Sequence, residues 1–439
     1  MRIVILIFCL FAMPIAAAQV GLPSVRLPLG GPGLPNLPTT DLSTESKLSA
    51  EFSGADLRGL RALRIRTLLR AHRDVVEADP YGNPIVRGEV LTIDPSPAVL
   101  QAAAAAGFAV VREATLSGLD VHVVVLRGTS DTGRSLARLQ ASDPAGIYDF
   151  NHIYIESGTA MAISGGGTQP TAAAQQTSGG TDQRPALVGL IDSGVDSAHE
   201  VFSGLKLHQH GCSGRVIPDE HGTAVASLIV GRSAVFHGAA PGGELYAADV
   251  YCGLPTGGAA DVVAESFSWL VQEGVPVINV SLVGPPNRLL EAVVQHVITG
   301  GHIVVAAVGN DGPAAPPLYP AAWPGVVGVT GVDDGNRVLV EAQRGPQVKF
   351  AAPAAKMAAA KRPSGYTLVR GTSFAAPIVA GLLALRLSEP DKAAADRAVM
   401  ALAQEAVNLG SARPSPVYGF GLVGEGLRRQ PVLTTLRAD

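Results

Sequence analysis

The chain carries the segment GTSFAAP at Gly371–Pro377, followed by a run of apolar and small residues from Ile378 to Leu387. A helix that is apolar on every side is buried, so this run predicts a core helix with Ser373 at its start. The first turn of a helix has free backbone N–H groups and the positive end of the helix dipole, which stabilise a developing oxyanion. A serine that only caps a core helix has the same pattern. We expect Pro377 in the first turn, where its missing N–H costs little.

The length of the chain indicates more than one folded unit, and its N-terminal residues indicate export. The chain has 439 residues, of which 47% are hydrophobic and 16% charged, and a net charge of −4 that gives no reason to expect nucleic acid as a partner. Residues 1–18 combine Arg2, the apolar stretch Ile3–Ile15 and three alanines, which is the pattern of a secretory signal peptide. We therefore expect export to the periplasm or the extracellular space, with no membrane span in the mature chain.

Two cysteines, Cys212 and Cys252, remain after the signal peptide. In an oxidising compartment one disulfide between them is the simplest hypothesis. Two unpaired, buried thiols are the alternative, because free cysteine is often buried.

Residues 19–84 are predicted to hold an extended arm and a helix. Gly21–Pro38 is rich in Pro and Gly, which cannot sustain a helix or a central strand. Asp56–Val76 has a stripe of leucines among many arginines and predicts an amphipathic helix. We expect this helix to dock on its own protein with a solvated arginine face. A helix for a membrane surface or an acidic partner is the alternative.

Residues 85–156 have the order β-α-β-β-α-β, which predicts a ferredoxin-like domain. Asp94 is the predicted cap of the first helix. The predicted strands are Ile85–Ile93, Phe108–Arg112, Leu119–Leu126 and Ile147–Ile155, and the helices are Pro95–Ala106 and Ser130–Ala141. Residues 157–184 are small and almost uncharged, which is typical of a flexible linker.

Residues 185–430 alternate short apolar runs with helical stretches and predict a doubly wound α/β domain with a parallel sheet, followed by a tail at 431–439. The predicted helices are His221–Val230, Gly258–Glu273 and Asn287–Gly300, and the runs are Ala186–Ile191, Leu245–Asp249, Val277–Val280 and Ile303–Val308. In such sheets the active site lies outside the carboxyl ends of the strands.

Four polar residues occur at such ends. Asp192 and Asn310 each follow an apolar run, while His221 and Ser373 each open a helical stretch. Each residue alone has a structural explanation as a cap or a turn. Together, Asp, His and Ser in this chain order match one known arrangement of the hydrolytic triad.

The residues around these four positions resemble the subtilisin-like serine proteases, the subtilases. The resemblance runs from Ala186 to about Leu422 and includes VINVSL at Val277–Leu282. It implies that Ser373 is the nucleophile, His221 the general base and Asp192 the residue that orients the histidine. It also implies an oxyanion hole with Asn310, the function of a serine endopeptidase, protein or peptide substrates, and a monomer that requires no cofactor. A structural Ca²⁺ is possible, but no residue identifies its site.

The resemblance places a substrate-binding segment just after the third apolar run. Val283 stands where subtilases lead one to expect Gly, and with Val308 and Leu318 it is expected to narrow the pocket for the residue before the scissile bond. We expect a preference for small or modest apolar residues there. The candidate substrate-binding residues are Ser281, Leu282, Val283, Gly284, Val308 and Leu318.

A ferredoxin-like domain before the catalytic domain is similar to a subtilase propeptide. The resemblance implies that it assists folding and inhibits the enzyme, and that the chain cleaves itself between Ile155 and Gly180. A permanently attached N-terminal domain is the alternative. A pseudoenzyme that keeps only the fold is a second alternative, and the intact Asp192, His221, Asn310 and Ser373 argue against it. An α/β-hydrolase esterase would need a Gly-x-Ser-x-Gly motif and a Ser, Asp, His order, and the sequence has neither.

Overall fold

The computed structural model describes residues 54–128, 131–157, 159–161 and 185–429, with the side chains of 54–60 and 159–161 left undescribed. The predicted signal peptide, the Pro/Gly-rich arm, most of the linker and the C-terminal tail lie outside these residues. Among the described residues, no helix is both long and apolar enough to cross a membrane.

The N-terminal domain is an antiparallel sheet with two helices, in the order that the sequence predicts. Its strands pair in the order β5-β2-β4-β3, which is the ferredoxin-like arrangement. A short strand, β1 (Val76–Ala78), also pairs with the start of β2. The elements are α2 (Gly54–Ala71), β2 (Pro84–Ile93), α3 (Pro97–Ala105), β3 (Ala109–Leu116), β4 (Val121–Arg127), α4 (Thr132–Ser142) and β5 (Ile147–His152).

Two predictions for this domain are wrong. The arginine-rich helix ends at Ala71 and not at Val76, because Val76 pairs with Val86 in the β1–β2 hairpin. Asp94 does not cap α3. Its φ is 43°, and its carboxylate accepts a hydrogen bond from the backbone N–H of His122 at 2.7 Å. Ser96 is the cap and accepts from the N–H of Val99.

The C-terminal domain is built on a parallel sheet of seven strands in the order β15-β14-β13-β11-β8-β10-β9. The sequence predicts the four strands β8, β10, β11 and β13, and the structure adds β9, β14 and β15. The strands are β8 (Leu187–Asp192), β9 (Leu207–Gly211), β10 (Glu244–Asp249), β11 (Val277–Val280), β13 (Ile303–Ala307), β14 (Val327–Val332) and β15 (Val348–Pro353).

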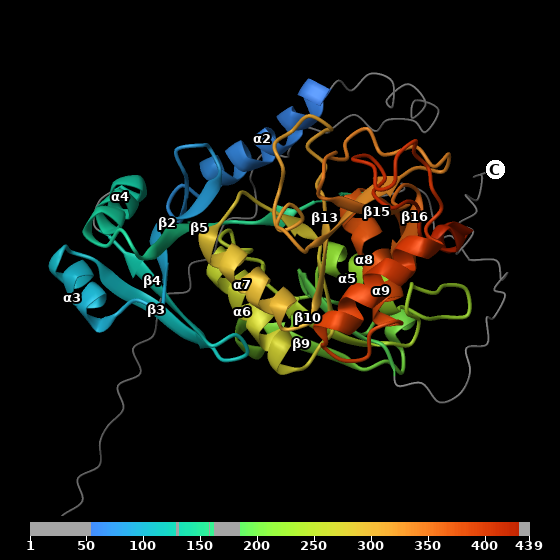
Figure 1. Ribbon diagram of the computed structural model, residues 1–439, viewed down its shortest axis with the longest axis horizontal. Coiled ribbons are helices and arrows are strands. Elements are labelled where there is room, and N and C mark those ends of the chain that lie inside the picture. Colours follow the sequence, from blue (N-terminus) through green and yellow to red (C-terminus); the bar gives the residue numbers. More distant parts are fainter. Residues whose placement is uncertain (1–53, 129–130, 158, 162–184, 430–439) are drawn as a thin grey trace, which may run out of the picture. The chain divides into compact units, whose positions relative to one another are not determined.

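Helices cover both faces of this sheet, so that it is doubly wound (Figure 1). The residues of α5, α8 and α9 pack on one face and those of α6 and α7 on the other. The remaining elements are α5 (Glu220–Val230), α6 (Ala260–Gln272), α7 (Arg288–Thr299), α8 (Thr372–Ala384), α9 (Lys392–Glu405), the strands β6 (Ile155–Glu156), β7 (Thr159–Met161), β12 (Leu282–Val283), β16 (Met357–Ala360) and β17 (Tyr366–Arg370), and the 3₁₀ turns Glu200–Phe202, Cys212–Gly214 and Glu425–Arg429.

The N-terminal domain packs on α6 and α7 through its sheet. Leu91, Leu116 and Val123 share a hydrophobic cluster with residues of both helices. The contact also has a charged centre, in which Arg112 bridges the buried Glu89 of β2 at 2.6 Å and Asp261 of α6 at 2.7 Å. Glu89 is only 1% exposed, and its charge is stabilised by this pairing together with a second arginine, Arg127, at 2.8 Å.

Candidate active site

The four candidate residues meet at the carboxyl edge of the parallel sheet. Asp192 is the last residue of β8, and Asn310 lies three residues beyond the end of β13. His221 is in the first turn of α5, and Ser373 is the second residue of α8. The helices α5 and α8 pack against each other (Figure 1), which brings residues 152 positions apart in sequence into contact.

The histidine bridges the other two members of the predicted triad. Its Nδ1 lies 2.8 Å from Asp192 Oδ1, and its Nε2 lies 3.2 Å from Ser373 Oγ. In a neutral ring, a proton on Nδ1 bonded to the carboxylate leaves the Nε2 lone pair facing the serine. All three residues are at most 5% exposed. This is the geometry of a nucleophile, a base and an orienting carboxylate.

Ser193, which the sequence analysis does not single out, holds the carboxylate in place. Its N–H and its hydroxyl lie 2.7 and 3.2 Å from Asp192 Oδ1, and its Oγ accepts from the N–H of Gly222 at 3.0 Å. Ser193 therefore links the end of β8 to the first turn of α5. Asp192 Oδ2 is buried and makes no hydrogen bond among the described residues.

Burial and nearby charges act in opposite directions on His221. Burial lowers its pKa, whereas the negative charges of Asp192 and Glu156 raise it, with the net result of about 9. Glu156 is a further residue that the sequence analysis missed as a site residue. Burial raises its pKa, the charge of His221 lowers it, and Asp192 raises it, so that the net pKa is above the usual value.

The side chain of Asn310 is held from one side and points into the site on the other. Its Oδ1 accepts from the backbone N–H of Thr372 at 3.1 Å, and its Nδ2 donates to the backbone carbonyl of Ser157. The hydroxyl of Thr372 in turn accepts from the N–H of Gly309 at 3.2 Å. A fixed amide donor beside the serine is the arrangement of an oxyanion hole.

The segment that ends the N-terminal domain crosses this site as an extended strand. Glu156 and Ile155 pair antiparallel with Leu282 and Val283, and the Ser157 N–H donates to the carbonyl of Ser281 at 3.4 Å. On the other side of residue 158, β7 pairs antiparallel with β17. The chain is therefore held as a strand on both sides of Ser157, whose carbonyl faces Asn310.

Tyr154 anchors this segment to the C-terminal domain. It is fully buried, its hydroxyl donates to the carbonyl of Pro285 at 2.7 Å, and its N–H donates to the carbonyl of Gly258 at 2.8 Å. The ring lies against Gly284, where an added Cβ would come within 2.6 Å of it. Glycine at 284 thus permits the close approach of the tyrosine ring.

The helix α2 lies over the same half of the site. Arg61 forms an ion pair with Asp311, the neighbour of Asn310, at 3.4 Å. Leu68 and Leu69 pack in a cluster with Ile155. A pocket of about 490 Å³ is lined by Arg64 and Ile65 of this helix and by Glu156. The helix therefore docks on its own protein, as predicted, but part of its arginine face is buried in the contact.

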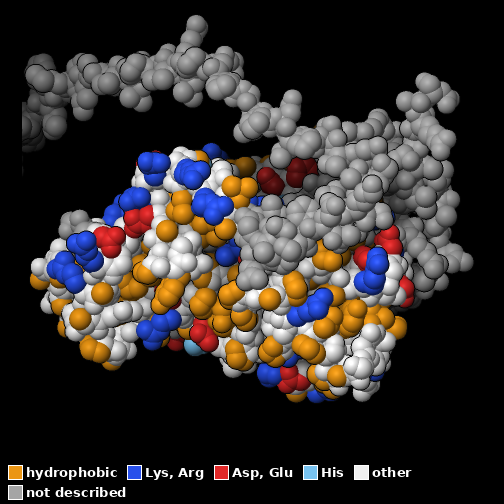
Figure 2. Space-filling model, turned by 90° about the horizontal axis from the view of Figure 1, so that it is seen from above, with side chains coloured by type: hydrophobic (Ala, Val, Ile, Leu, Met, Phe, Trp, Pro, Cys, Tyr) orange, Lys and Arg blue, Asp and Glu red, His pale blue; other side chains and the backbone are white. Residues whose placement is uncertain are grey.

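Three further arginines of this helix, among those whose side chains the structure describes, face solvent. Arg64, Arg66 and Arg70 are exposed. Figure 2 views the molecule from the side that carries α2 and shows Lys and Arg side chains among hydrophobic ones.

The predicted substrate-binding residues fall into two groups: apolar residues that are buried near the site, and Ser281, whose side chain contacts another part of the protein. Val283 is buried in β12, and the bridge between Gly284 and Tyr319 brings Leu318 close to it. Val308 is buried directly after β13. Ser281 pairs with Ser157 through its backbone, but its side chain points elsewhere and donates to the carbonyl of Ser373.

The prediction for Pro377 is wrong. It is the sixth residue of α8 and lies in the second helical turn, where its missing N–H removes an intrahelical hydrogen bond.

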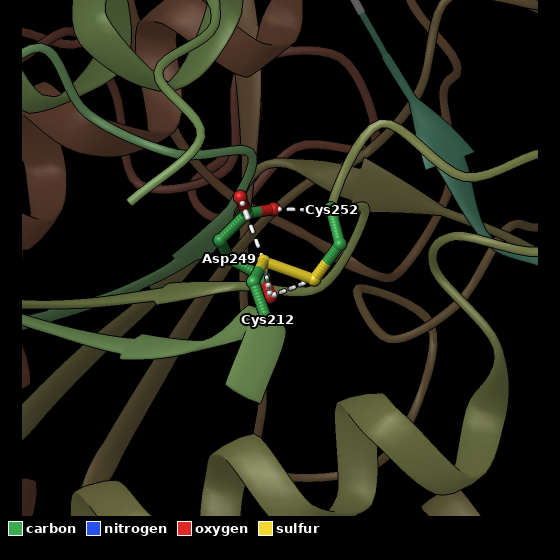
Figure 3. A group of neighbouring side chains, drawn as sticks. All are labelled: Cys212, Asp249 and Cys252. Carbon is green, nitrogen blue, oxygen red and sulfur yellow. Dashed lines mark hydrogen bonds between the residues drawn. A yellow bond between two sulfur atoms is a disulfide. The ribbon is translucent and has the colours of Figure 1, made fainter. Parts of the chain in front are cut away.

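Cys212 and Cys252 lie side by side after β9 and β10 (Figure 3), with sulfur atoms 2.10 Å apart. Asp249 lies beneath them and accepts from the N–H groups of Tyr251 and Cys252, each at 2.9 Å. Burial raises the pKa of Asp249. The pair joins the ends of two strands beside the site, as the disulfide hypothesis requires.

Two groups of described residues have the side chains that metals prefer. One is Cys212, Asp249 and Cys252, and the other is Glu156, Asp192 and His221. In the first, the two sulfur atoms lie at disulfide distance from each other. In the second, both nitrogens of the imidazole already face protein oxygens. We assign neither group to a metal.

A buried Asp, His and Ser at the carboxyl edge of a doubly wound sheet define a class of hydrolase that uses a serine nucleophile. The sequence model of the Subtilase family matches residues 183–421, more than half of the chain. The chain belongs to this family and is a subtilisin-like serine endopeptidase.

The chain is 32% identical to subtilisin DY of Bacillus licheniformis over 245 residues, which are 54% of this chain and 88% of that protein. It is 31% identical to subtilisin E of Bacillus subtilis (strain 168) over 264 residues, 56% of this chain and 66% of that protein. The crystal structure of fervidolysin from Fervidobacterium pennivorans, a keratinolytic enzyme related to subtilisin, matches with a TM-score of 0.64 at 19% identity. That match covers 82% of this chain and 63% of fervidolysin, so the likeness in fold extends beyond the C-terminal domain.

Proposed function

We propose that this protein is an exported serine endopeptidase made as a zymogen, and that it cleaves its own chain between Ser157 and Gly158. The observation that carries this proposal is the Ser157 carbonyl, which accepts a hydrogen bond from Asn310 in the site where His221 faces Ser373. The peptide bond after Ser157 thus has a nucleophile, a base and an oxyanion donor of the same chain around it.

In the proposed reaction, Ser373 Oγ attacks the carbonyl carbon of Ser157 while His221 Nε2 takes the hydroxyl proton. Asp192 keeps the imidazole oriented and stabilises its positive charge. Asn310 Nδ2 donates to the oxygen as it becomes negative. The imidazolium then gives its proton to the nitrogen of Gly158, the C–N bond breaks, and Ser157 is left as an ester of Ser373. Water, activated by the same histidine, hydrolyses the ester.

Ser157 also fits the pocket prediction. Val283, Val308 and Leu318 are expected to narrow the pocket that binds the residue before the scissile bond. A serine side chain is small enough for such a narrow pocket. Ser157 is polar, so it matches the prediction in size alone; we propose that later substrates carry a small or modest apolar residue before the scissile bond.

The N-terminal domain is proposed to act as folding aid and inhibitor. After cleavage, β6 would remain paired with β12, and Tyr154 would remain in its buried position against Gly284. The ion pair of Arg61 with Asp311 and the contacts of β5 with α7 also bind the N-terminal domain to the C-terminal domain. Inhibition would then persist until the N-terminal domain dissociates or is itself digested.

Export is supported by the signal-peptide pattern at residues 1–18 and by the Cys212–Cys252 pair, since disulfides persist in oxidising compartments. The periplasm and the extracellular space both meet this condition.

The test is intact mass and N-terminal sequencing of the wild type and of Ser373→Ala, each produced alone. We expect wild-type protein to show a new N-terminus at Gly158 and to react with a fluorophosphonate once the N-terminal domain has dissociated, and Ser373→Ala to stay intact and unlabelled. Ser266→Ala is a matched control. Ser266 is a buried serine of α6, outside the proposed site, and its hydroxyl donates to the carbonyl of Val262. Cleavage of Ser373→Ala in the absence of wild-type protein would exclude self-processing.

A further inference from the structure

Helix α8 lacks a hydrogen-bond donor at the carbonyl of Ser373. In an α-helix, this carbonyl accepts from the N–H four residues later, which here belongs to Pro377. Proline has no N–H, so that bond cannot form. Ser373 is 0% exposed, and a buried carbonyl without a donor destabilises the position that it occupies.

The hydroxyl of Ser281 takes the place of this donor. Ser281 Oγ lies 3.0 Å from the carbonyl oxygen of Ser373, and Ser281 is itself 0% exposed. Asn279 Nδ2 donates to Ser281 Oγ at 2.8 Å. A serine hydroxyl has one proton, so the bond from Asn279 leaves that proton directed at Ser373. The three buried residues form one chain of hydrogen bonds that ends on the nucleophile's backbone.

This chain connects the nucleophile to the strand that pairs with the substrate segment. Ser281 stands between β11 and β12, its own carbonyl accepts from the N–H of Ser157, and the next two residues pair with Glu156 and Ile155. One residue therefore contacts the substrate backbone with its main chain and the nucleophile backbone with its side chain. A shift of α8 relative to β12 would stretch this contact.

We propose that Ser281 is a positioning residue that holds Ser373 in register with the substrate strand, in place of the helix bond that Pro377 removes. The proposal rests on the proposed role of Ser373 as nucleophile. It assigns to the Ser281 side chain a function distinct from substrate binding. Because the hydroxyl compensates for one specific missing N–H, restoring that N–H should make the hydroxyl dispensable.

The test is a double-mutant cycle with Ser281→Ala and Pro377→Ala in the full-length chain, followed by self-processing rate and by kcat and KM on a peptide substrate. We expect Ser281→Ala to lower kcat and the processing rate roughly tenfold with little change in KM. Pro377→Ala alone should stay near the wild type. The double variant should recover to within about threefold of it, because the alanine N–H can donate to Ser373.

Ser227→Ala is the matched control. Ser227 is also 0% exposed, and its hydroxyl also donates to a backbone carbonyl, that of Ala224. We expect Ser227→Ala to lower the melting temperature without a selective loss of kcat, and Pro377→Ala not to restore it.

Additive losses in the cycle, or an unchanged kcat in Ser281→Ala, would overturn the proposal. If Ser281→Ala folds poorly, a well-folded and active double variant supports it, and an equally defective one refutes it. Ser373→Ala distinguishes a failure of the proposed nucleophile from a failure of the proposed role of Ser281. Residual hydrolysis in this variant contradicts Ser373 as the nucleophile, whereas an inactive variant together with an additive cycle contradicts only the role of Ser281.

Discussion

Replacing Tyr154 by alanine should release the N-terminal domain after cleavage. The side chain is 0% exposed, its ring lies against Gly284, and its hydroxyl donates to Pro285 at 2.7 Å. Truncation of a buried aromatic side chain to alanine typically costs roughly 3–5 kcal/mol. Since these contacts are all with the C-terminal domain, the loss should weaken the complex of the two cleaved parts by roughly a hundred- to several-thousand-fold.

Tyr154→Phe separates the ring from the hydroxyl. It keeps the apolar contact with Gly284 but leaves the buried carbonyl of Pro285 without its donor, at a cost of about 1–3 kcal/mol. We therefore expect a smaller effect, of roughly tenfold. Tyr81→Ala is the control, because Tyr81 is in the N-terminal domain but is 89% exposed.

The assay follows the recovery of peptidase activity after a self-processed preparation is diluted, with size-exclusion chromatography to detect dissociation. Recovery should be fastest for Tyr154→Ala, intermediate for Tyr154→Phe, and unchanged for Tyr81→Ala. If Tyr154→Ala recovered activity at the wild-type rate while remaining folded, the contact would have no role in retention, and the reasoning from burial would be refuted.

Three further changes test other contacts. Glu156→Gln should let self-cleavage begin at lower pH, because the carboxylate raises the pKa of His221, which in the proposed mechanism must lose its proton to act as a base; an unshifted pH profile of the processing rate would contradict this. Arg61→Ala should speed recovery after dilution severalfold, whereas the exposed Arg70→Ala should not, and equal rates would remove α2 from the inhibitory contact. Replacing Cys212 and Cys252 by serine should lower the unfolding free energy by about 4 kcal/mol for a loop of 40 residues, measured by denaturant titration, and two free thiols in the unreduced wild type would contradict the disulfide.

Much of the fold follows from local sequence patterns. The strands Leu187–Asp192 and Val277–Val280 are buried, and short continuous apolar runs that alternate with helical stretches predict such strands. The order of elements in residues 85–156 likewise predicts the ferredoxin-like domain. Errors occur where a distant contact outweighs a local pattern. Val76 continues the helical pattern in sequence but pairs with β2, and Asp94 resembles a cap but binds the backbone of His122.

For the candidate site too, local motifs predict some features, and distant contacts in the structure supply the others. Asp192, His221, Asn310 and Ser373 stand in recognisable local motifs, so the sequence was enough to predict the class of enzyme and the candidate residues for its chemistry. What surrounds them is visible only in the tertiary structure: the charge of Glu156 acts on His221, the Ser157 carbonyl accepts from Asn310, and the Ser281 hydroxyl donates to the Ser373 carbonyl. The physical reason is that these contacts join residues far apart in the chain, up to 153 positions for Ser157 and Asn310, and a local pattern carries no information about which distant group a hydrogen bond will find.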